Sequence, residues 1–368
     1  MNDSLVNQFF LENSLQLVVV TEGLTGHRLK WLEKLTQLLG KVNQPLRVVT
    51  LEESQKVFSD KLLSQIEADI VDFIFVNNRN ALFPTAEKLF ASSPNVQFVI
   101  WDADDWLFKL LKTPIPFRAL AIRPYLTEIK SSAIIKFTTK NLLYTLINMR
   151  KNGKLAKLSV PLAKSIFRRK HWIEDDLTVH EMRKVTPAGK RFTDSNSNTL
   201  LIPGFISARK RPELAISVVH ALNSVCSTHW QLIFMGKIDP KCAEIIKEAR
   251  GDHIMVIDKY MDDSTYQEIL ASVDIVLLLY KNRGASGIAV ESCLLGTPVV
   301  MAYSRLWKGV ERELPQKFRL VRLRVEKIVD AILELSKERQ GHPDDLFVVS
   351  EILKLSNTRE GITQFFIS

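Results

Sequence analysis

Residues 274–300 read DIVLLLYKNRGASGIAVESCLLGTPVV, and this stretch decides the fold. Its first part, 274–280, is an apolar run bounded by polar residues, which is typical of a strand buried on both faces of a parallel sheet. The small residues of 284–287 predict a tight turn into a helix over 288–295. Gly296 then ends the helix before the chain returns to the sheet. The stretch therefore predicts a strand, a loop, a helix and a second strand.

The start of this predicted helix is a candidate binding site. A helix leaves its first backbone N–H groups without acceptors, and its dipole is positive at that end. A phosphate or a sugar hydroxyl fits such a position. We therefore expect the backbone N–H groups of Ser286, Gly287 and Ile288 to contact a ligand.

The pattern Gly-x-x-Gly, then Glu291, then Gly-Thr-Pro-Val-Val resembles the donor-sugar loop of GT-B glycosyltransferases of the family 4 (group 1) type. The resemblance implies that Glu291 hydrogen-bonds the ribose of a nucleotide-sugar donor. The family has another Glu eight residues earlier, which contacts the donor sugar and supports its positive charge. Arg283 stands there instead, so it is a candidate for binding an acidic donor sugar or a phosphate. The alternative is an ordinary βαβ unit of another doubly wound domain.

A second segment of the C-terminal half also resembles this family. An apolar strand leads to Gly204, and Lys210 follows six residues later. The resemblance implies that Lys210 neutralises the donor diphosphate. The family arginine is replaced by Phe205, and Arg209 or Arg211 is expected to compensate. Fixed cations in a desolvated site stabilise a departing diphosphate, as a metal ion does elsewhere.

Further loops after predicted strands give more candidates. In the resembling family, the loop at Gly236 lines the nucleotide pocket, and the loop after 254–258 brackets the base. The first loop of the chain contains Gly23 and Gly26, which the resemblance places near the donor diphosphate. His27 in the same loop is an acceptor-side candidate, and a capping or packing role is its alternative.

The N-terminal half alternates predicted strands at 46–51, 72–76 and 96–101 with helical segments, which indicates a parallel sheet. Asp102 and Asp104 follow the last of these strands. GT-A glycosyltransferases use an Asp-x-Asp to hold a divalent cation, because hard oxygen ligands suit Mg²⁺ or Mn²⁺. Against this, Asp104 also suits the start of the next helix. In GT-B enzymes this loop faces the cleft, so Asp102 is an acceptor-side candidate, and we predict no metal site.

The 368 residues suffice for two domains, each with its own core. We predict the GT-B fold, with two Rossmann-like, doubly wound parallel-sheet domains facing a cleft. The predicted parts are an acceptor-side domain over 1–187, a nucleotide-sugar domain over 188–345, and a C-terminal helix, 346–368, that crosses back to the first domain.

The net charge of +9 is unevenly distributed. Residues 130–170 contain many Lys and Arg residues, no acidic residue, and apolar residues at near-helical spacing. This pattern predicts either a helix that rests on anionic lipid or a core-facing helix with a solvated basic side. No nucleic-acid motif accompanies the charge. The sequence has neither a signal-peptide pattern nor a long apolar run, so we expect a cytosolic protein, either free or peripheral on the inner face of the cytoplasmic membrane.

These observations predict an enzyme that transfers a sugar from a nucleotide-diphosphate sugar to a hydroxyl of a glycan or lipid-linked acceptor, with retention and without a metal or cofactor. Lys210, Arg209, Glu291 and Arg283 are the catalytic candidates. One alternative is a metal-dependent enzyme built on the Asp-x-Asp. The other is a non-catalytic partner protein that binds a sugar nucleotide. The three cysteines are expected to be reduced and buried.

Overall fold

The structure is a computed structural model of the chain. For some residues, including 158–159 and 172–174, only the backbone is described. The described residues are 16–22, 29, 32–33, 35–36, 46–57, 60–68, 71–91, 93, 95–101, 103–121, 131–159, 172–174, 197–249, 251–280, 286–304 and 307–339.

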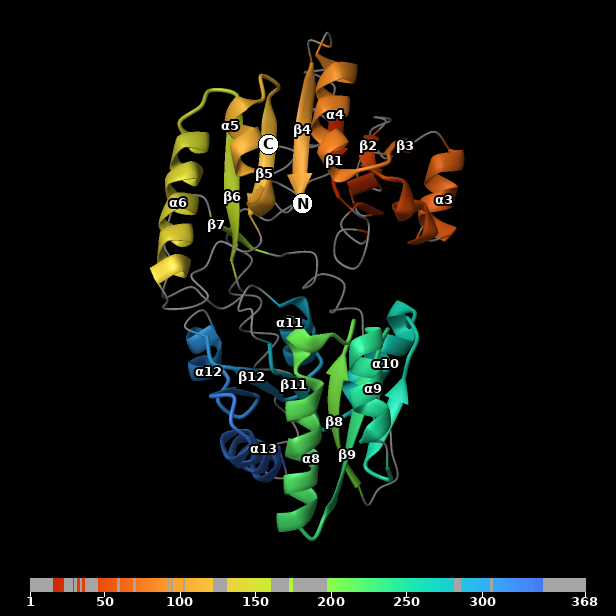
Figure 1. Ribbon diagram of the computed structural model, residues 1–368, viewed down its shortest axis with the longest axis vertical. Coiled ribbons are helices and arrows are strands. Elements are labelled where there is room, and N and C mark those ends of the chain that lie inside the picture. The colour runs from red at the N-terminus through yellow and green to blue at the C-terminus, as the bar shows by residue number, and fades with distance from the viewer. Residues whose placement is uncertain are drawn as a thin grey trace. The chain divides into compact units, whose positions relative to one another are not determined.

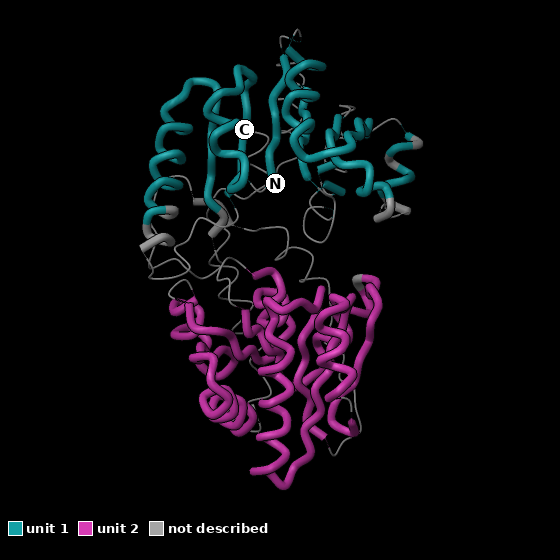
Figure 2. The backbone as a smooth tube through the Cα atoms, in the orientation of Figure 1, with its two compact units in different colours: residues 1–159, 169–175, 359–368 teal, residues 160–168, 176–358 magenta. Residues whose placement is uncertain are grey.

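The chain divides into two compact units, which Figure 2 shows in separate colours. The predicted boundaries after 187 and 345, and the predicted returning helix 346–368, lie outside the described residues and stay predictions. Unit 1 comprises residues 1–159, 169–175 and 359–368, and unit 2 comprises residues 160–168 and 176–358.

Unit 1 is built on a seven-stranded sheet in the order β3-β2-β1-β4-β5-β6-β7, with every neighbouring pair parallel. Most side chains of β1, β4 and β5 are buried, as expected for strands covered on both faces. The strand order reverses between β1 and β4, which makes this pair the switch point of the sheet. The strands are β1 Gln16–Val20, β2 Leu46–Leu51, β3 Val71–Val76, β4 Val96–Trp101, β5 Phe117–Ala121, β6 Gly153–Ser159 and β7 Trp172–Glu174.

Three α-helices, α4, α5 and α6, lie on one face of this sheet (Figure 1). Their apolar side chains, such as Phe83, Leu110 and Ile147, share one core with Phe98 and Ile100 of β4. Burying each such side chain contributes roughly 1.5–3 kcal/mol. The helices of unit 1 are η1 Glu52–Val57, α3 Asp60–Glu67, η2 Arg79–Ala81, α4 Leu82–Phe90, η3 Ala103–Asp105, α5 Leu107–Lys112 and α6 Ser131–Asn148.

Unit 2 contains a six-stranded parallel sheet in the order β10-β9-β8-β11-β12-β13, with its switch point between β8 and β11. A side chain reinforces this central pair, because Asp274 Oδ2 accepts hydrogen bonds from N and Oγ1 of Thr199, at 2.8 and 2.9 Å. The strands are β8 Ser197–Pro203, β9 His229–Met235, β10 Ile254–Ile257, β11 Ile275–Leu278, β12 Val299–Ala302 and β13 Phe318–Val321.

Helices α8 and α13 lie side by side on one face of the second sheet (Figure 1). Val219 of α8 and Ile332 of α13 pack with Leu200, Phe234 and Leu277 of the central strands. The helices of unit 2 are η5 Ala208–Lys210, α8 Pro212–Val225, α9 Pro240–Glu248, α10 Asp263–Ser272, α11 Gly287–Leu294, α12 Lys308–Glu313 and α13 Val325–Arg339.

The predicted strands 46–51 and 96–101 are confirmed residue for residue as β2 and β4. The three cysteines are unpaired. Cys242 and Cys293 are buried as predicted, but Cys226 is half-buried, so the prediction is wrong for that residue. Burial raises the pKa of the Cys293 thiol to about 12, which keeps it protonated and unreactive.

Candidate functional site

The predicted donor-side segments meet at the switch point of the second sheet. Open parallel sheets bind ligands beyond the carboxyl ends of their strands at this point. β8 leads into Gly204 and then into η5, and its neighbour β11 leads through Tyr280 to α11. The two segments that the sequence analysis singled out therefore leave adjacent strands at the same edge of the sheet.

Two glycines allow these loops to pack closely. Gly204 and Gly236 have φ angles of +79° and +124°, a region that favours glycine. A Cβ on Gly236 would lie 2.6 Å from the carbonyl oxygen of Gly204. A Cβ on Gly204 would lie 3.1 Å from Lys210 Nζ and 3.6 Å from Ile288 Cδ1. Four of the predicted binding residues are thus immediate neighbours.

Lys210 is a buried cation at this position. Only 3 % of its surface is exposed, and its ammonium donates to the carbonyl of Pro203, the last residue of β8. Burial, and then the charge of Arg209, lower the pKa of Lys210 to about 7. Near neutral pH the side chain therefore exchanges readily between its neutral and charged forms, and a nearby anion favours the charged form.

Tyr280 contacts both cations. Its ring centroid lies 5.2 Å from Arg209 Cζ and 5.9 Å from Lys210 Nζ, within the range of cation–π interactions. The Ser286 side chain lies near enough to the Tyr280 hydroxyl to act on its pKa. Burial raises the pKa of Tyr280 to about 12, while Arg209 and Ser286 oppose the rise and Glu291 adds to it. The hydroxyl therefore keeps its proton at neutral pH.

Helix α11 begins beside this cluster. Ser286 is its N-cap, and the Ser286 hydroxyl accepts from the N–H of Ala289 at 3.4 Å. The first-turn N–H groups, which an α-helix leaves without helical acceptors, belong to Gly287 and Ile288. Glu291, one turn further, is buried, and its charge acts on Tyr280. Its predicted contact with ribose stays a prediction.

Arg211 is a strained residue between η5 and α8. Its φ of 54° and ψ of 60° are left-handed, and it is the one non-glycine with positive φ among the residues that the structure describes. This conformation costs roughly 1–2 kcal/mol. Its Nε is buried and makes no hydrogen bond to any described residue. The segment 209–211 thus supplies three consecutive cations.

Several predicted residues lie outside the described residues, and their roles stay predictions. They are Gly23, Gly26, His27, Asp102 and Arg283.

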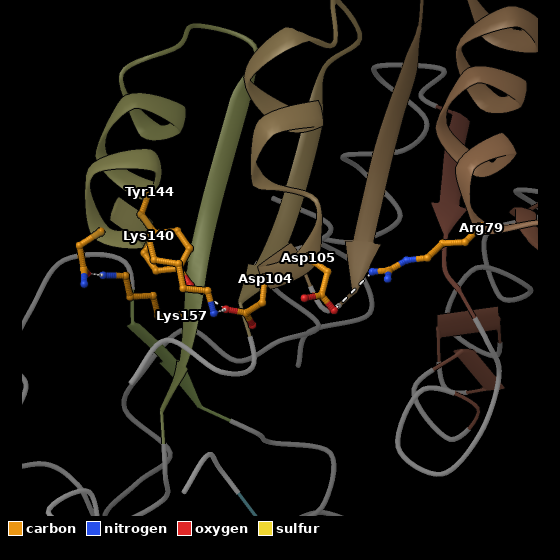
Figure 3. Close-up of polar contacts among 7 residues, drawn as sticks. Arg79, Asp104, Asp105, Lys140, Tyr144 and Lys157 are labelled. Carbon is orange, nitrogen blue, oxygen red and sulfur yellow. Dashed lines mark hydrogen bonds and ion pairs between the residues drawn. The ribbon is translucent and has the colours of Figure 1, made fainter. Parts of the chain in front are cut away.

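The carboxyl edge of the first sheet also carries charged residues, and there they pair with one another (Figure 3). Asp104 Oδ1 accepts hydrogen bonds from Lys140 Nζ at 2.6 Å and from the Tyr144 hydroxyl at 2.7 Å. The Asp104 side chain is 1 % exposed. Lys157 Nζ lies 4.7 Å from the Tyr144 ring centroid and donates to Asn141 at 2.9 Å. The Asp104 carboxylate is therefore already held by a cation and a hydroxyl.

Arg79 makes the second set of contacts at this edge. Its guanidinium lies 3.4 Å from Asp105 Oδ2 and 3.2 Å from Glu22 Oε2. The sequence had indicated Asp104 as a residue that starts the next helix, but Asp104 does not cap α5. That helix begins after Trp106 with no side-chain hydrogen bond at its start.

The sequence analysis missed Tyr280, Arg79, Lys140 and Tyr144. Tyr280 had one signal, because it is a tyrosine at the carboxyl end of an apolar central strand. The partnership of Asp104 with α6 had none, since 36 residues separate Asp104 from Lys140.

No protein-family profile matches the sequence, and no curated protein matches it. Solved structures do match its fold. A putative UDP-N-acetylglucosamine 2-epimerase from Listeria monocytogenes superposes with a TM-score of 0.58 at 12% identity, covering 92% of this chain and 94% of that one. WaaG, a glycosyltransferase involved in lipopolysaccharide biosynthesis, superposes with a TM-score of 0.56 at 10% identity, covering 95% of this chain and 97% of that one. A sucrose-phosphate synthase from Thermosynechococcus elongatus superposes with a TM-score of 0.55 at 11% identity, covering 93% of this chain and 98% of that one.

These likenesses confirm the predicted fold. The chain has the GT-B glycosyltransferase fold, an α/β architecture of two Rossmann-like units with parallel sheets. Epimerases share this fold with glycosyltransferases, so the reaction has to be argued from the site itself.

Proposed function

We propose that this protein transfers a sugar from a nucleotide-diphosphate sugar to a hydroxyl of a glycan or lipid-linked acceptor. Solved glycosyltransferases with the same fold support this proposal. The observation that carries it is the cluster at the β8–β11 switch point. There Lys210 and Arg209 lie against Tyr280 and next to the start of α11.

The cluster suits a diphosphate leaving group. Charge that develops on the departing diphosphate is stabilised most by cations and N–H donors fixed in place in a desolvated site. In this proposal Lys210 and Arg209 supply the cations, and the N–H groups of 286–288 supply the donors. Because the pKa of Lys210 is about 7, donor binding above that pH draws a proton onto its neutral amine and converts it to the ammonium. Glu291 holds the ribose, and Arg283 contacts the donor sugar or a phosphate.

We infer that the reaction retains the anomeric configuration and needs no metal ion. The resemblance supports retention, and the cations take the part that a metal has in Asp-x-Asp enzymes. Asp104 is bound by Lys140 and Tyr144, which disfavours it as a metal ligand. Activity should survive EDTA, and the product should keep the donor's anomeric configuration by NMR. Loss of activity that Mn²⁺ restores would favour the metal-dependent alternative built on Asp102.

We propose that unit 1 binds the acceptor, with His27 and Asp102 as candidates, and that the protein works in the cytosol. No described helix has the length and apolar character to cross a bilayer.

We also propose that α6 rests on an anionic lipid surface. The buried side of α6 is apolar. A second apolar stripe follows the opposite side, and its residues are spaced seven, four and three positions apart. Lys140, Arg150 and Lys157 contact other parts of unit 1, whereas Lys151 and Lys154 are exposed near the helix end. Each exposed cation would add about 1 kcal/mol near anionic headgroups. The stripe comprises Ile135, Leu142, Leu146 and Met149, which are 65%, 59%, 41% and 76% exposed.

Vesicle sedimentation tests this surface. The protein should pellet with vesicles containing phosphatidylglycerol and much less with pure phosphatidylcholine. Replacing Leu142, Leu146 and Met149 together with serine should abolish pelleting. The control Val225→Ser changes an exposed apolar residue of α8, 68% exposed, and should pellet normally. Pelleting of the triple variant at the wild-type level would refute the proposal.

The enzymatic proposal is tested by a screen for nucleoside diphosphate release. Nucleotide sugars are first ranked by thermal shift, since binding raises apparent stability. Release with a transferred sugar supports the transferase. Binding without release identifies a sugar-nucleotide-binding partner protein, and an altered sugar on an intact nucleotide identifies an epimerase. Glu291→Ala should weaken nucleotide binding in calorimetry, and unchanged affinity would remove Glu291 from the site.

A further inference from the structure

Tyr280 connects parts of the donor site that come from different segments of the chain. The ring contacts η5, which follows β8, and the hydroxyl lies near the start of α11, which follows β11. Tyr280 and Lys210 are buried, whereas Arg209 is exposed, so water screens the contact with Lys210 little and the contact with Arg209 more.

The ring faces two like charges. The positive charge of Arg209 disfavours the ammonium form of Lys210 and, together with burial, lowers the pKa of Lys210. The two cations repel each other, and water screens part of this repulsion because Lys210 is buried but Arg209 is exposed. The negative face of an aromatic ring, 5.2 and 5.9 Å from the two groups, offsets part of that repulsion.

The hydroxyl lies near the residue that starts α11, because the Ser286 side chain acts on its pKa. The oxygen of Ser286 accepts from Ala289 N, so Tyr280 is placed to help fix where the helix begins. The N–H groups of Gly287 and Ile288 follow directly. The side chain of Ile288 in turn lies against the Gly204 turn, which also approaches Lys210.

We propose that Tyr280 is the positioning residue of the diphosphate site: its ring holds Arg209 and Lys210, and its hydroxyl holds the start of α11 in register with them. The inference rests on the proposed donor site, because Tyr280 would hold the groups that bind the anion in that site. Tyr280 acts through these groups and needs no contact with the substrate.

The test measures binding of inorganic pyrophosphate to the full chain by calorimetry from pH 6 to 9, in two buffers of different ionisation enthalpy. This design gives both the affinity and the number of protons taken up. Tyr280→Phe keeps the ring, so affinity should fall about 3–10-fold, as for one lost hydrogen bond, with the pH profile of proton uptake unchanged. Tyr280→Leu should weaken binding by about 5–30-fold and move that profile to lower pH, because the Lys210 cation loses the ring.

Controls separate this inference from the donor site itself. Lys210→Met should lose both pyrophosphate affinity and proton uptake, and wild-type behaviour would overturn the donor site. If Lys210→Met is impaired but both Tyr280 variants match wild type in affinity and pH profile, only the role of Tyr280 is overturned. Tyr303→Leu removes a ring 5.4 Å from Lys308 Nζ, outside the cluster, and should bind normally. If Tyr280→Leu fails to fold, Tyr280→Phe decides, and its unchanged affinity would overturn the proposal.

Discussion

Replacing Lys210 with methionine should stabilise the protein at pH 6 and cease to do so near pH 10. Burial, and then Arg209, lower the pKa of Lys210 from 10.5 to about 7 in the folded protein. Between these values the unfolded chain binds one more proton than the folded chain, so the free energy of unfolding rises with pH. Below pH 7 both states are protonated, and the folded state bears the full cost of the buried charge. Above pH 10.5 both are neutral, and that cost disappears.

The pKa difference corresponds to roughly 5 kcal/mol at most. The variant also removes the donor to the Pro203 carbonyl, which costs about 1–3 kcal/mol. We expect a net stabilisation of about 2–4 kcal/mol at pH 6, or about 5–12 °C in Tm for a domain of this size, and a small destabilisation at pH 10.

Differential scanning calorimetry of the full chain from pH 6 to 10, at constant ionic strength, measures this difference. Lys237→Met is the matched control. It removes an exposed lysine that lies 3.7 Å from Asp258, and its effect on Tm should hardly depend on pH over this range. If Lys210→Met shifts Tm equally at pH 6 and pH 10, the Lys210 ammonium is not desolvated, and the argument for a poised cation fails.

Three further changes have expected outcomes. Gly236→Ala would place a Cβ 2.6 Å from the Gly204 carbonyl at a φ of +124°, so we expect a loss of at least ~3 kcal/mol in chemical denaturation, and a loss near zero would contradict the close packing. Asp274→Ala removes the acceptor that ties β8 to β11 and should cost about 2–4 kcal/mol in the same assay, more than Asp274→Asn. Asp104→Asn leaves the Lys140 ammonium without its charged partner and should lower stability by about 1–3 kcal/mol while EDTA-treated activity persists, whereas a new metal dependence would contradict the structural role.

The order of strands was predictable because apolar runs and small-residue turns alternate along the chain. β2 and β4 were located to the residue, since polar residues flank each run.

The site was predictable only in part. The resemblance to the GT-B family, carried by a glycine after an apolar strand and a lysine six residues later, indicated Gly204 and Lys210. Tyr280 gave little signal, because its role depends on two loops that lie about 75 residues apart in the sequence. The strands that lead to these loops are equally far apart, and they meet through the hydrogen bond between Thr199 and Asp274. The basic segment of unit 1 was hardest to interpret, because a lysine on a surface and a lysine in a buried ion pair, such as Lys140, look alike in sequence.

The two sheets have corresponding strand orders, except for one additional strand in unit 1, but they differ in charge near their switch points. We propose from this difference that the donor binds to unit 2. Among the described residues of unit 1, Asp104 pairs with Lys140, and Arg79 lies between two carboxylates. In unit 2, residues 209–211 are three consecutive cations, and the buried Glu291 acts on Tyr280, which Arg209 and Lys210 also contact. Of these cations Lys210 is buried, Arg211 half-buried and Arg209 exposed. Such an excess of positive charge favours a ligand with about two negative charges, whereas a balanced set of pairs favours a neutral hydroxyl. Under this proposal unit 2 takes the anionic donor and unit 1 the uncharged acceptor, and reversing the charge at Lys210 should abolish donor binding without affecting unit 1.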